Sequence, residues 1–253
     1  MSRSKQRPGR RVLGGLLGAV CLALTAAGCG SNGTADVTLQ PTPRHIVAAV
    51  NGTVFAPNGQ FAAAAGWRRW ACTFNLLSPA YAQTCLMNLL PAGGTLNVAL
   101  WHVDSIDAKD GKIDNPRLIN QARTDDQGLY EIVDPAAEHI DECRLMVVVG
   151  SNDILTRAFV IEQTNNLDAV SEAVVRVVLA RLTQSPPVQL CDFTNAGLNN
   201  ILKQANDAAC SAKGDTVAEI NQSVYDHVRV NCGVAQAIND ATGVPVPLPS
   251  HCL

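Results

Sequence analysis

The residues best suited to bind a metal ion are four aspartates in the stretch DSIDAKDGKID, namely Asp104, Asp107, Asp110 and Asp114. Calcium loops place oxygen ligands at alternate positions and end with a bidentate acid, whereas these aspartates recur every three and then four residues. The spacing favours a solvated loop or an edge turn, with calcium binding as the alternative.

The stretch TDDQGLYEI, residues 124–132, also contains acidic residues that could bind a metal ion. Asp125 and Asp126 are adjacent, so their side chains diverge in an extended chain, and no third ligand is near in sequence. Acidic residues before a glycine are typical of turns. We therefore expect a corner between two strands here, not a metal site.

Other catalytic or metal-binding patterns are absent from the sequence. It has no His-Glu-x-x-His, no Cys-x-x-Cys, no Gly-x-Ser-x-Gly and no glycine-rich phosphate loop. The five histidines are scattered at His45, His102, His139, His227 and His251. We predict no metal, no cofactor and no enzymatic activity.

Residues 1–28 have the pattern of a bacterial lipoprotein leader: a basic start, an apolar core too short to span a bilayer, and TAAGC. TAAGC resembles a lipobox, which implies that Cys29 is lipidated and becomes the new N-terminus. Ordinary secretory cleavage at AAG is the alternative. We expect an outer-membrane lipoprotein on the periplasmic face or at the cell surface, held to the membrane by its lipid anchor.

The charge of the mature chain argues against nucleic acid as a partner. Cleavage removes five basic residues and no acidic one, which changes the formal net charge from -3 to about -8. No basic run remains outside the leader. Residues 29–44 are small, polar and contain proline, as expected of a flexible tether.

Residues 45–164 have the pattern of an antiparallel β-sandwich. Short apolar runs are separated by turn residues, with Asn51-Gly52 expected to break the first run and Pro57-Asn58-Gly59 to close it. In the run from Thr95 to Val103, alternate residues are expected to point inward. The runs cover residues 46–62, 95–103, 129–133, 143–150 and 154–162.

The order of these motifs resembles the carboxypeptidase regulatory-like domain, a prealbumin-like sandwich. The motifs are VNGTVFAPNG, GTLNVALW, TDDQGLYEI, VVVG and RAFV. The resemblance implies a positive φ at Gly128 and an inward-facing Tyr130. It also implies an accessory binding module without catalysis, and carbohydrate as the one class of ligand found among relatives.

An insertion at residues 60–93 departs from that family. Trp67, Arg68, Arg69, Trp70 and Tyr81 are candidate ligand-binding residues, because aromatic faces stacked with guanidinium groups recognise sugars or protein partners. The alternative is that the tryptophans anchor the insertion to the sandwich. We expect a disulfide between the insertion's two cysteines, Cys72 and Cys85.

Residues 165–253 are predicted to be mainly helical. A first helix is expected over residues 165–182, capped by Asp168 and with a Glu172–Arg176 pair, although its valines leave a strand as the alternative. A second helix is expected over residues 193–210. A third should begin with a capping box from Thr216 to Glu219, and the proline-bearing tail from residue 243 should be extended.

Four cysteines brace this helical region in the predicted structure. If the second and third helices form a hairpin, helix length excludes the Cys210–Cys232 and Cys191–Cys210 pairs. We therefore expect disulfides between Cys191 and Cys232 and between Cys210 and Cys252. An odd cysteine then remains, and Cys143 is the candidate for a buried free thiol.

Together these patterns predict a non-enzymatic, lipid-anchored envelope protein that acts as a structural or protein-interaction module. The alternative function is a carbohydrate-binding module that uses the aromatic residues of the insertion. The expected partner is another envelope protein or a glycan.

Overall fold

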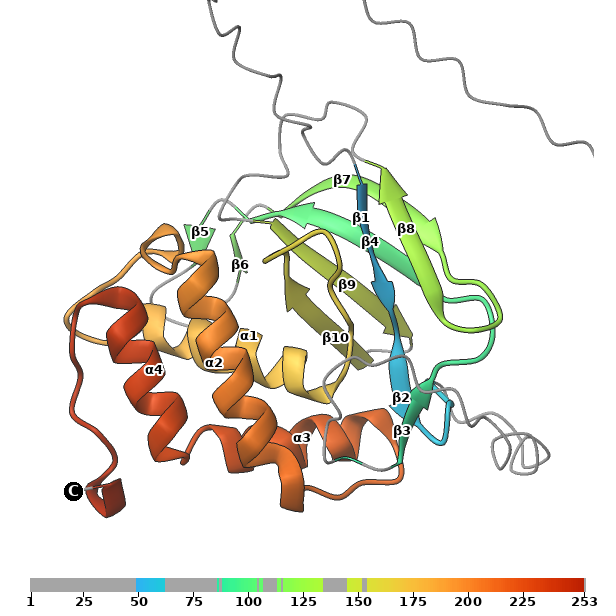
Figure 1. The fold of residues 1–253 in the computed structure, drawn as a ribbon. Coiled ribbons are helices and arrows are strands. Elements are labelled where there is room, and N and C mark those ends of the chain that lie inside the picture. The colour runs from blue at the N-terminus through green and yellow to red at the C-terminus, as the bar shows by residue number, and fades with distance from the viewer. Residues whose placement is uncertain are drawn as a thin grey trace, which may run out of the picture. The chain divides into compact units, whose positions relative to one another are not determined.

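A computed structural model of the chain describes residues 49–61, 86, 88–103, 105–106, 113–114, 116–133, 145–151 and 154–252. All of these residues belong to one compact unit, Pro43–Leu253. Antiparallel strands come first and helices follow, as Figure 1 shows. The predicted order, with an antiparallel β part followed by a helical part, is confirmed.

The strands pair in small antiparallel sheets. The largest has the order β10-β9-β4-β7, and the two-stranded pairs are β1-β8, β2-β3 and β5-β6. The strands are β1 Ala49–Thr53, β2 Phe55–Pro57, β3 Leu89–Pro91, β4 Asn97–His102, β5 Ser105–Ile106, β6 Ile113–Asp114, β7 Arg117–Arg123, β8 Leu129–Val133, β9 Leu145–Ser151 and β10 Ile154–Phe159.

Four α-helices lie within the described part of the chain after β10. Among the described residues, no helix is both long enough and apolar enough to cross a membrane. The helices are α1 Ala169–Leu182, η2 Leu190–Asp192, α2 Asn195–Ala208, η3 Ala209–Ser211, α3 Val217–Val228, α4 Cys232–Thr242 and η4 Ser250–Cys252.

Strand β9 divides two hydrophobic clusters, because alternate side chains of a strand point to opposite faces. Val147 and Val149 are fully buried in a cluster with residues of β1 and β8. Met146 and Val148 pack in a second cluster, which contains the helices. The helices and the β1-β8 pair thus lie on opposite sides of the four-stranded sheet (Figure 1).

Helix α1 begins where the sequence predicts its cap. Asp168 accepts hydrogen bonds from the backbone N–H groups of Val170 and Ser171 at 2.9 and 2.8 Å. The predicted Glu172–Arg176 pair is wrong, because Glu172 faces the sheet and binds Arg157 of β10 at 2.6 Å.

The turn in TDDQGLYEI is confirmed. Asp125 Oδ1 accepts the backbone N–H groups of Gln127 and Leu129 at 2.8 and 2.9 Å, as a turn-forming aspartate does. Gly128 has a φ of 75°, and Tyr130 is buried. Asp125 is therefore engaged in the turn itself.

The predicted chain break at Asn51-Gly52 is wrong. Asn51 and Gly52 lie inside β1 instead of interrupting it. A Cβ on Gly52 would lie 2.0 Å from the carbonyl oxygen of Asn165, so glycine is needed for close approach and not for a turn. Helix α3 begins at the predicted capping box and ends at Val228, and Asn231 caps a further helix, α4, that the sequence analysis did not predict.

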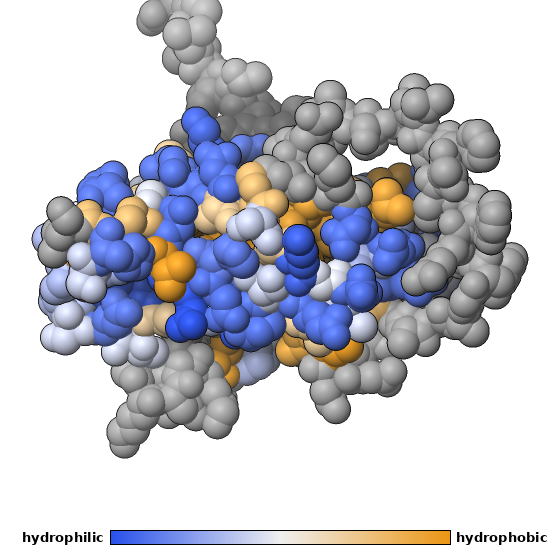
Figure 2. All heavy atoms as spheres, turned by 90° about the horizontal axis from the view of Figure 1, so that it is seen from below, coloured by the Kyte–Doolittle hydropathy of each residue, from blue (hydrophilic) through white to orange (hydrophobic). Residues whose placement is uncertain are grey.

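The sheet and helices form a single unit in which the second cluster joins both predicted regions. The face seen in Figure 2 is mainly hydrophilic, with apolar residues in smaller patches. Large hydrophobic side chains that remain exposed among the described residues are Leu118, Leu129, Val133, Leu155 and Val230.

Candidate functional site

A pocket of about 310 Å³ lies between α1, α3, α4 and the chain that follows α4. Its volume is at the lower end of the range for small-molecule sites. Most of its lining residues are apolar, and the others are polar or charged. The lining residues are Val177, Ala180, Arg181, Gln184, Tyr225, Val228, Arg229, Val230, Val234, Ala235, Ile238, Val246, Pro247 and Pro249.

Arg181 belongs to the floor of this pocket, because it lines the pocket while only 2% of its surface is exposed. It lies in the last turn of α1, on the side that carries the buried Val177 and Val178. Its Nη1 donates to the carbonyl of Pro186 at 2.9 Å, and its Nη2 donates to the carbonyl of Val244 at 3.0 Å. The guanidinium therefore joins α1 to the segment after α4.

The charge of Arg181 is not neutralised by any described residue. No carboxylate in the described ranges forms an ion pair with it, and its Nε has no hydrogen-bond partner there. Burial lowers the pKa of the Arg181 guanidinium from its ordinary value. An arginine nevertheless stays protonated in proteins, so a positive charge lies buried at the pocket floor.

The rim of the pocket carries further cationic groups. Arg229 Nε forms an ion pair with Asp226 at 2.9 Å, at the exposed end of α3. The guanidinium of Arg176 lies 3.6 Å from the centre of the Tyr225 ring, a cation–π contact. The single acid of this group, Asp226, is already engaged, so the rim does not neutralise Arg181.

The outer wall of the pocket is fixed to α4 by Asn239. This buried side chain donates from Nδ2 to the carbonyl of Val246 and accepts the N–H of Val246 at Oδ1, both at 3.0 Å. The pair of bonds holds Val246 against α4. Together with the Arg181–Val244 bond, they place the segment before Pro249 over the ends of α1 and α4.

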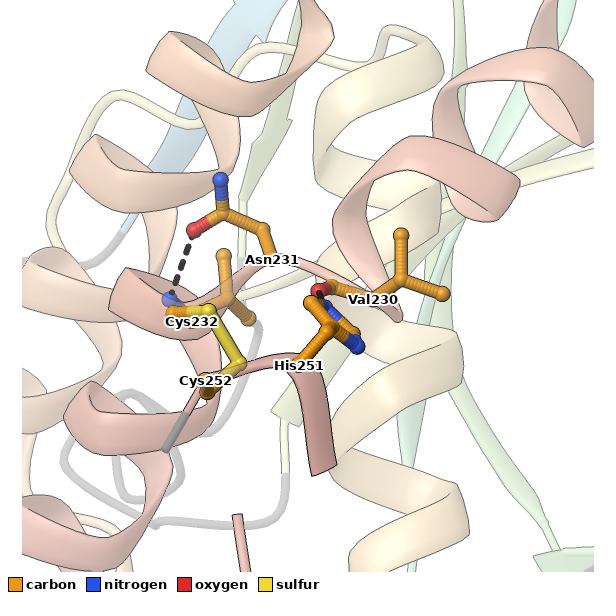
Figure 3. Close-up of a disulfide and its surroundings, with 6 residues drawn as sticks. Val230, Asn231, Cys232, His251 and Cys252 are labelled. Carbon is orange, nitrogen blue, oxygen red and sulfur yellow. Dashed lines mark hydrogen bonds between the residues drawn. A yellow bond between two sulfur atoms is a disulfide. The ribbon is translucent and has the colours of Figure 1, made fainter. Parts of the chain in front are cut away.

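A disulfide holds the C-terminal end of the segment that forms the outer wall of the pocket. Cys232, the first residue of α4, is bonded to Cys252, and their Cα atoms lie 5.5 Å apart (Figure 3). Beside it, His251 Nε2 lies 2.7 Å from the carbonyl oxygen of Val230, while Asn231 caps α4 by accepting the N–H of Val234. The C-terminal turn is thus tied to the junction of α3 and α4.

The Cys232–Cys252 bond shows that the predicted Cys191–Cys232 and Cys210–Cys252 disulfides are wrong. The prediction assumed that the third helix continues to Cys232. Because the chain turns after Val228 and starts α4, Cys232 meets the returning tail instead.

Cys191 and Cys210 are also disulfide-bonded. They lie on either side of α2, whose 14 residues span about 21 Å at 1.5 Å per residue. A disulfide joins Cα atoms within about 7 Å, so these two cysteines are not bonded to each other. Each is paired with a cysteine other than Cys232 or Cys252.

Cys232, His251 and Cys252 bring three possible metal-ligand atoms within 4.8 Å of one another. The ligand form of cysteine is the thiolate, and both sulfurs are joined in the disulfide. In this state the group is a covalent brace for the pocket wall.

None of the described lining residues of the pocket is among the ligand-binding residues that the sequence suggested. Those residues, Trp67, Arg68, Arg69, Trp70 and Tyr81, lie outside the described residues, so their role stays a prediction. The same holds for lipidation at Cys29, for the Cys72–Cys85 pair, and for Cys143. Of the possible calcium ligands only Asp114 falls in a described strand, β6, which pairs with β5.

The sequence carried one signal for this site that the prediction did not use. Arg181 interrupts the run VVRVVLARL close to its end, in a helix whose apolar residues extend around most of its circumference. A charged residue in such a helix must reach solvent or find a partner.

The pocket can hold an anionic group, because its floor supplies unused guanidinium donors within apolar walls. No family model, curated protein or solved structure matches this chain.

Proposed function

We propose that this chain is a non-enzymatic, lipid-anchored protein of the bacterial envelope that acts as an interaction module. The observation that carries the binding role is Arg181, a buried cation without a described counterion at the floor of a pocket. Isolated buried charge destabilises a fold, so such a group is typical of a site that receives an oppositely charged partner.

Export is supported by the state of the cysteines. Cys191, Cys210, Cys232 and Cys252 are all in disulfides. Disulfides persist in oxidising compartments such as the periplasm and the cell surface. This agrees with the leader-like pattern of residues 1–28 and with Cys29 as the lipid attachment site.

The β part is proposed to be a prealbumin-like sandwich. The β1-β8 pair and the four-stranded sheet enclose a common hydrophobic cluster, in which Val98 and Tyr130 take part from the two sides. The turn before Tyr130 has the geometry that the resemblance implies. Domains of that family serve binding, which favours an accessory function over catalysis.

The lipid anchor is tested by partitioning the chain, expressed in a bacterium, between detergent and aqueous phases. We expect the wild-type protein in the detergent phase and Cys29→Ala in the aqueous phase, because several acyl chains supply the membrane affinity. Cys21→Ala, a change in the leader, is the matched control and should partition like the wild type. Unchanged partitioning of Cys29→Ala would refute the proposal.

A further inference from the structure

We infer that the pocket around Arg181 binds a small carboxylate with an apolar body. The inference rests on the proposed function as an interaction module and deepens it by naming the class of ligand. It is carried by the chemistry of the pocket floor and the composition of its walls.

The floor specifies a negative charge. A guanidinium has five N–H donors, and the described contacts of Arg181 use Nη1 and Nη2 once each. The Nε group therefore has no partner among the described residues, and Nη1 and Nη2 each keep a second N–H bond. A carboxylate matches this planar fork and accepts two parallel hydrogen bonds, whereas an uncharged carbonyl would leave the buried cation uncompensated.

The two hydrogen bonds that Arg181 already makes favour a binding role over a purely structural one. Both acceptors, the carbonyls of Pro186 and Val244, are neutral. A neutral donor could bridge the same two segments at a lower desolvation cost than a guanidinium. The full charge of Arg181 is thus unexplained by its contacts with the described residues, and an anionic ligand would explain it.

The walls specify an apolar body for the ligand. Val177, Val228, Val234 and Ile238 are each at most 8% exposed and line the pocket together with Val246. Apolar ligand surface in contact with them would be removed from water, which contributes roughly 25 cal/mol per Å². The volume of about 310 Å³ restricts the ligand to a small molecule.

The position of the rim charges favours entry of an anion. Arg229 lines the pocket, and Arg176 lies against Tyr225, another lining residue. Asp226 is paired with Arg229, so the two arginines and this acid leave one net positive charge at the rim of a chain that is acidic overall. Such a charge attracts small anions and disfavours cationic ligands.

The test uses octanoate as the probe, titrated calorimetrically into the exported chain carrying Cys29→Ala, which requires no detergent. Octan-1-ol has the same apolar body without charge, and acetate has the charge without the apolar body. We expect octanoate to bind at least tenfold more tightly than either. Equal affinities for octanoate and octan-1-ol, or no binding of octanoate, would overturn the inference.

Two variants then locate the site. Arg181→Met should remove the preference for octanoate over octan-1-ol. Ala235→Phe should fill the pocket and weaken octanoate binding at least tenfold while Arg181 stays in place. If Arg181→Met does not fold, Ala235→Phe still tests whether octanoate binds in this pocket. The matched control is Ala218→Phe on the exposed side of α3, which should bind octanoate like the parent chain.

Octanoate binding that is unchanged in a folded Arg181→Met chain, or in Ala235→Phe, would place the ligand elsewhere and refute the site. These outcomes are independent of the lipid anchor, because partitioning of Cys29→Ala is measured separately. A chain that binds octanoate but lacks a lipid anchor would refute only the proposed membrane attachment.

Discussion

At the scale of single residues, one hydrogen bond joins the hairpin to the start of the helical part and lies directly against the first strand. Tyr130 is 4% exposed, and its hydroxyl donates to the carbonyl oxygen of Asn165. Gly52 leaves room for this contact, since a Cβ there would lie 2.8 Å from the Tyr130 hydroxyl. The glycine and the phenol therefore meet where three segments distant in sequence come together, beside the backbone hydrogen bond from Asn165 N–H to the carbonyl oxygen of Asn51 at 2.8 Å.

The first prediction concerns the stability of the fold at alkaline pH. Burial raises the pKa of Tyr130 far above its ordinary value of about 10. The unfolded chain releases this proton above pH about 10 while the folded chain retains it, so stability falls as the pH rises beyond that value. We expect the wild type to lose stability from pH about 10 upward and Tyr130→Phe to lose markedly less, as measured by urea unfolding.

At neutral pH, Tyr130→Phe should itself lower the free energy of unfolding by about 1 kcal/mol, through the lost hydrogen bond. Tyr225→Phe, at the rim of the pocket, serves as the control and should keep the alkaline slope of the wild type. Free thiols are blocked beforehand so that disulfides do not exchange. An alkaline slope that persists unchanged in Tyr130→Phe would assign it to another group.

At the scale of elements, helix α1 is the piece that connects the sheet to the pocket. Its first turn carries Glu172, which binds both the side chain and the backbone N–H of Arg157 in β10. Its last turn carries Arg181, which holds the segment after α4. Helix α1 therefore fixes the pocket floor relative to the sheet, while α3 is tied to β10 separately by Asn221.

The sequence was sufficient for elements whose signals are local. The cap at Asp168, the capping box from Thr216 to Glu219 and the turn at Asp125 all depend on residues within a few positions, and all were predicted correctly. Helix α4 was missed because Asn231 and Gly243, its first and last signals, were not used.

The candidate site could not be predicted because its contacts are distant in sequence. An arginine in the last turn of a helix is ordinarily a favourable surface residue. Arg181 is buried because Val244, 63 positions later, returns over it. In the same way Cys232 bonds Cys252 only because α3 stops early, and no local pattern indicates which tail residue comes back to it.

The second prediction concerns the Arg157–Glu172 pair, whose side chains are 20% and 6% exposed. We expect Glu172→Met to lower the free energy of unfolding by about 2–3 kcal/mol, because it leaves Arg157 unpaired in a mostly buried place. The double variant with Arg157→Met should cost less than the sum of the two single variants. A double-mutant cycle by urea unfolding measures this coupling.

The exposed pair Arg229–Asp226, with side chains 54% and 45% exposed, is the matched control for that cycle. Its coupling should lie between about 0 and 1 kcal/mol, since solvent screens surface pairs. If both cycles gave the same coupling, the Arg157–Glu172 contact would have no special part in holding α1 to the sheet.

At the scale of the whole molecule, the sheet is shared by two cores. One face packs against β1 and β8, and the other face contributes Met146 and Phe159 to the cluster that holds the helices. Separating the helices from the sheet would expose that second cluster to water. The two regions that differ so clearly in sequence pattern should therefore unfold together.

The third prediction tests this cooperativity. We expect thermal unfolding to show the same midpoint by ellipticity at 222 nm, which follows the helices, and by Trp101 fluorescence, which follows β4. The second signal requires a Trp67→Phe/Trp70→Phe background, which leaves Trp101 as the remaining one of the three tryptophans. Ile201→Ala, fully buried in α2, should destabilise the chain by about 2–5 kcal/mol and shift both midpoints equally.

We expect both midpoints to shift equally because the helices and the sheet share one hydrophobic cluster. Ile201 lies in the same cluster as Val175 of α1 and Met146 of β9, so a cavity in α2 weakens the packing that also covers the sheet. Asn200→Ala, at the neighbouring exposed position, should leave both midpoints close to those of the parent chain. A shift of the helical signal alone, with Trp101 unchanged, would show that the helices form an independent folding unit and that the shared sheet does not couple the pocket to the β part.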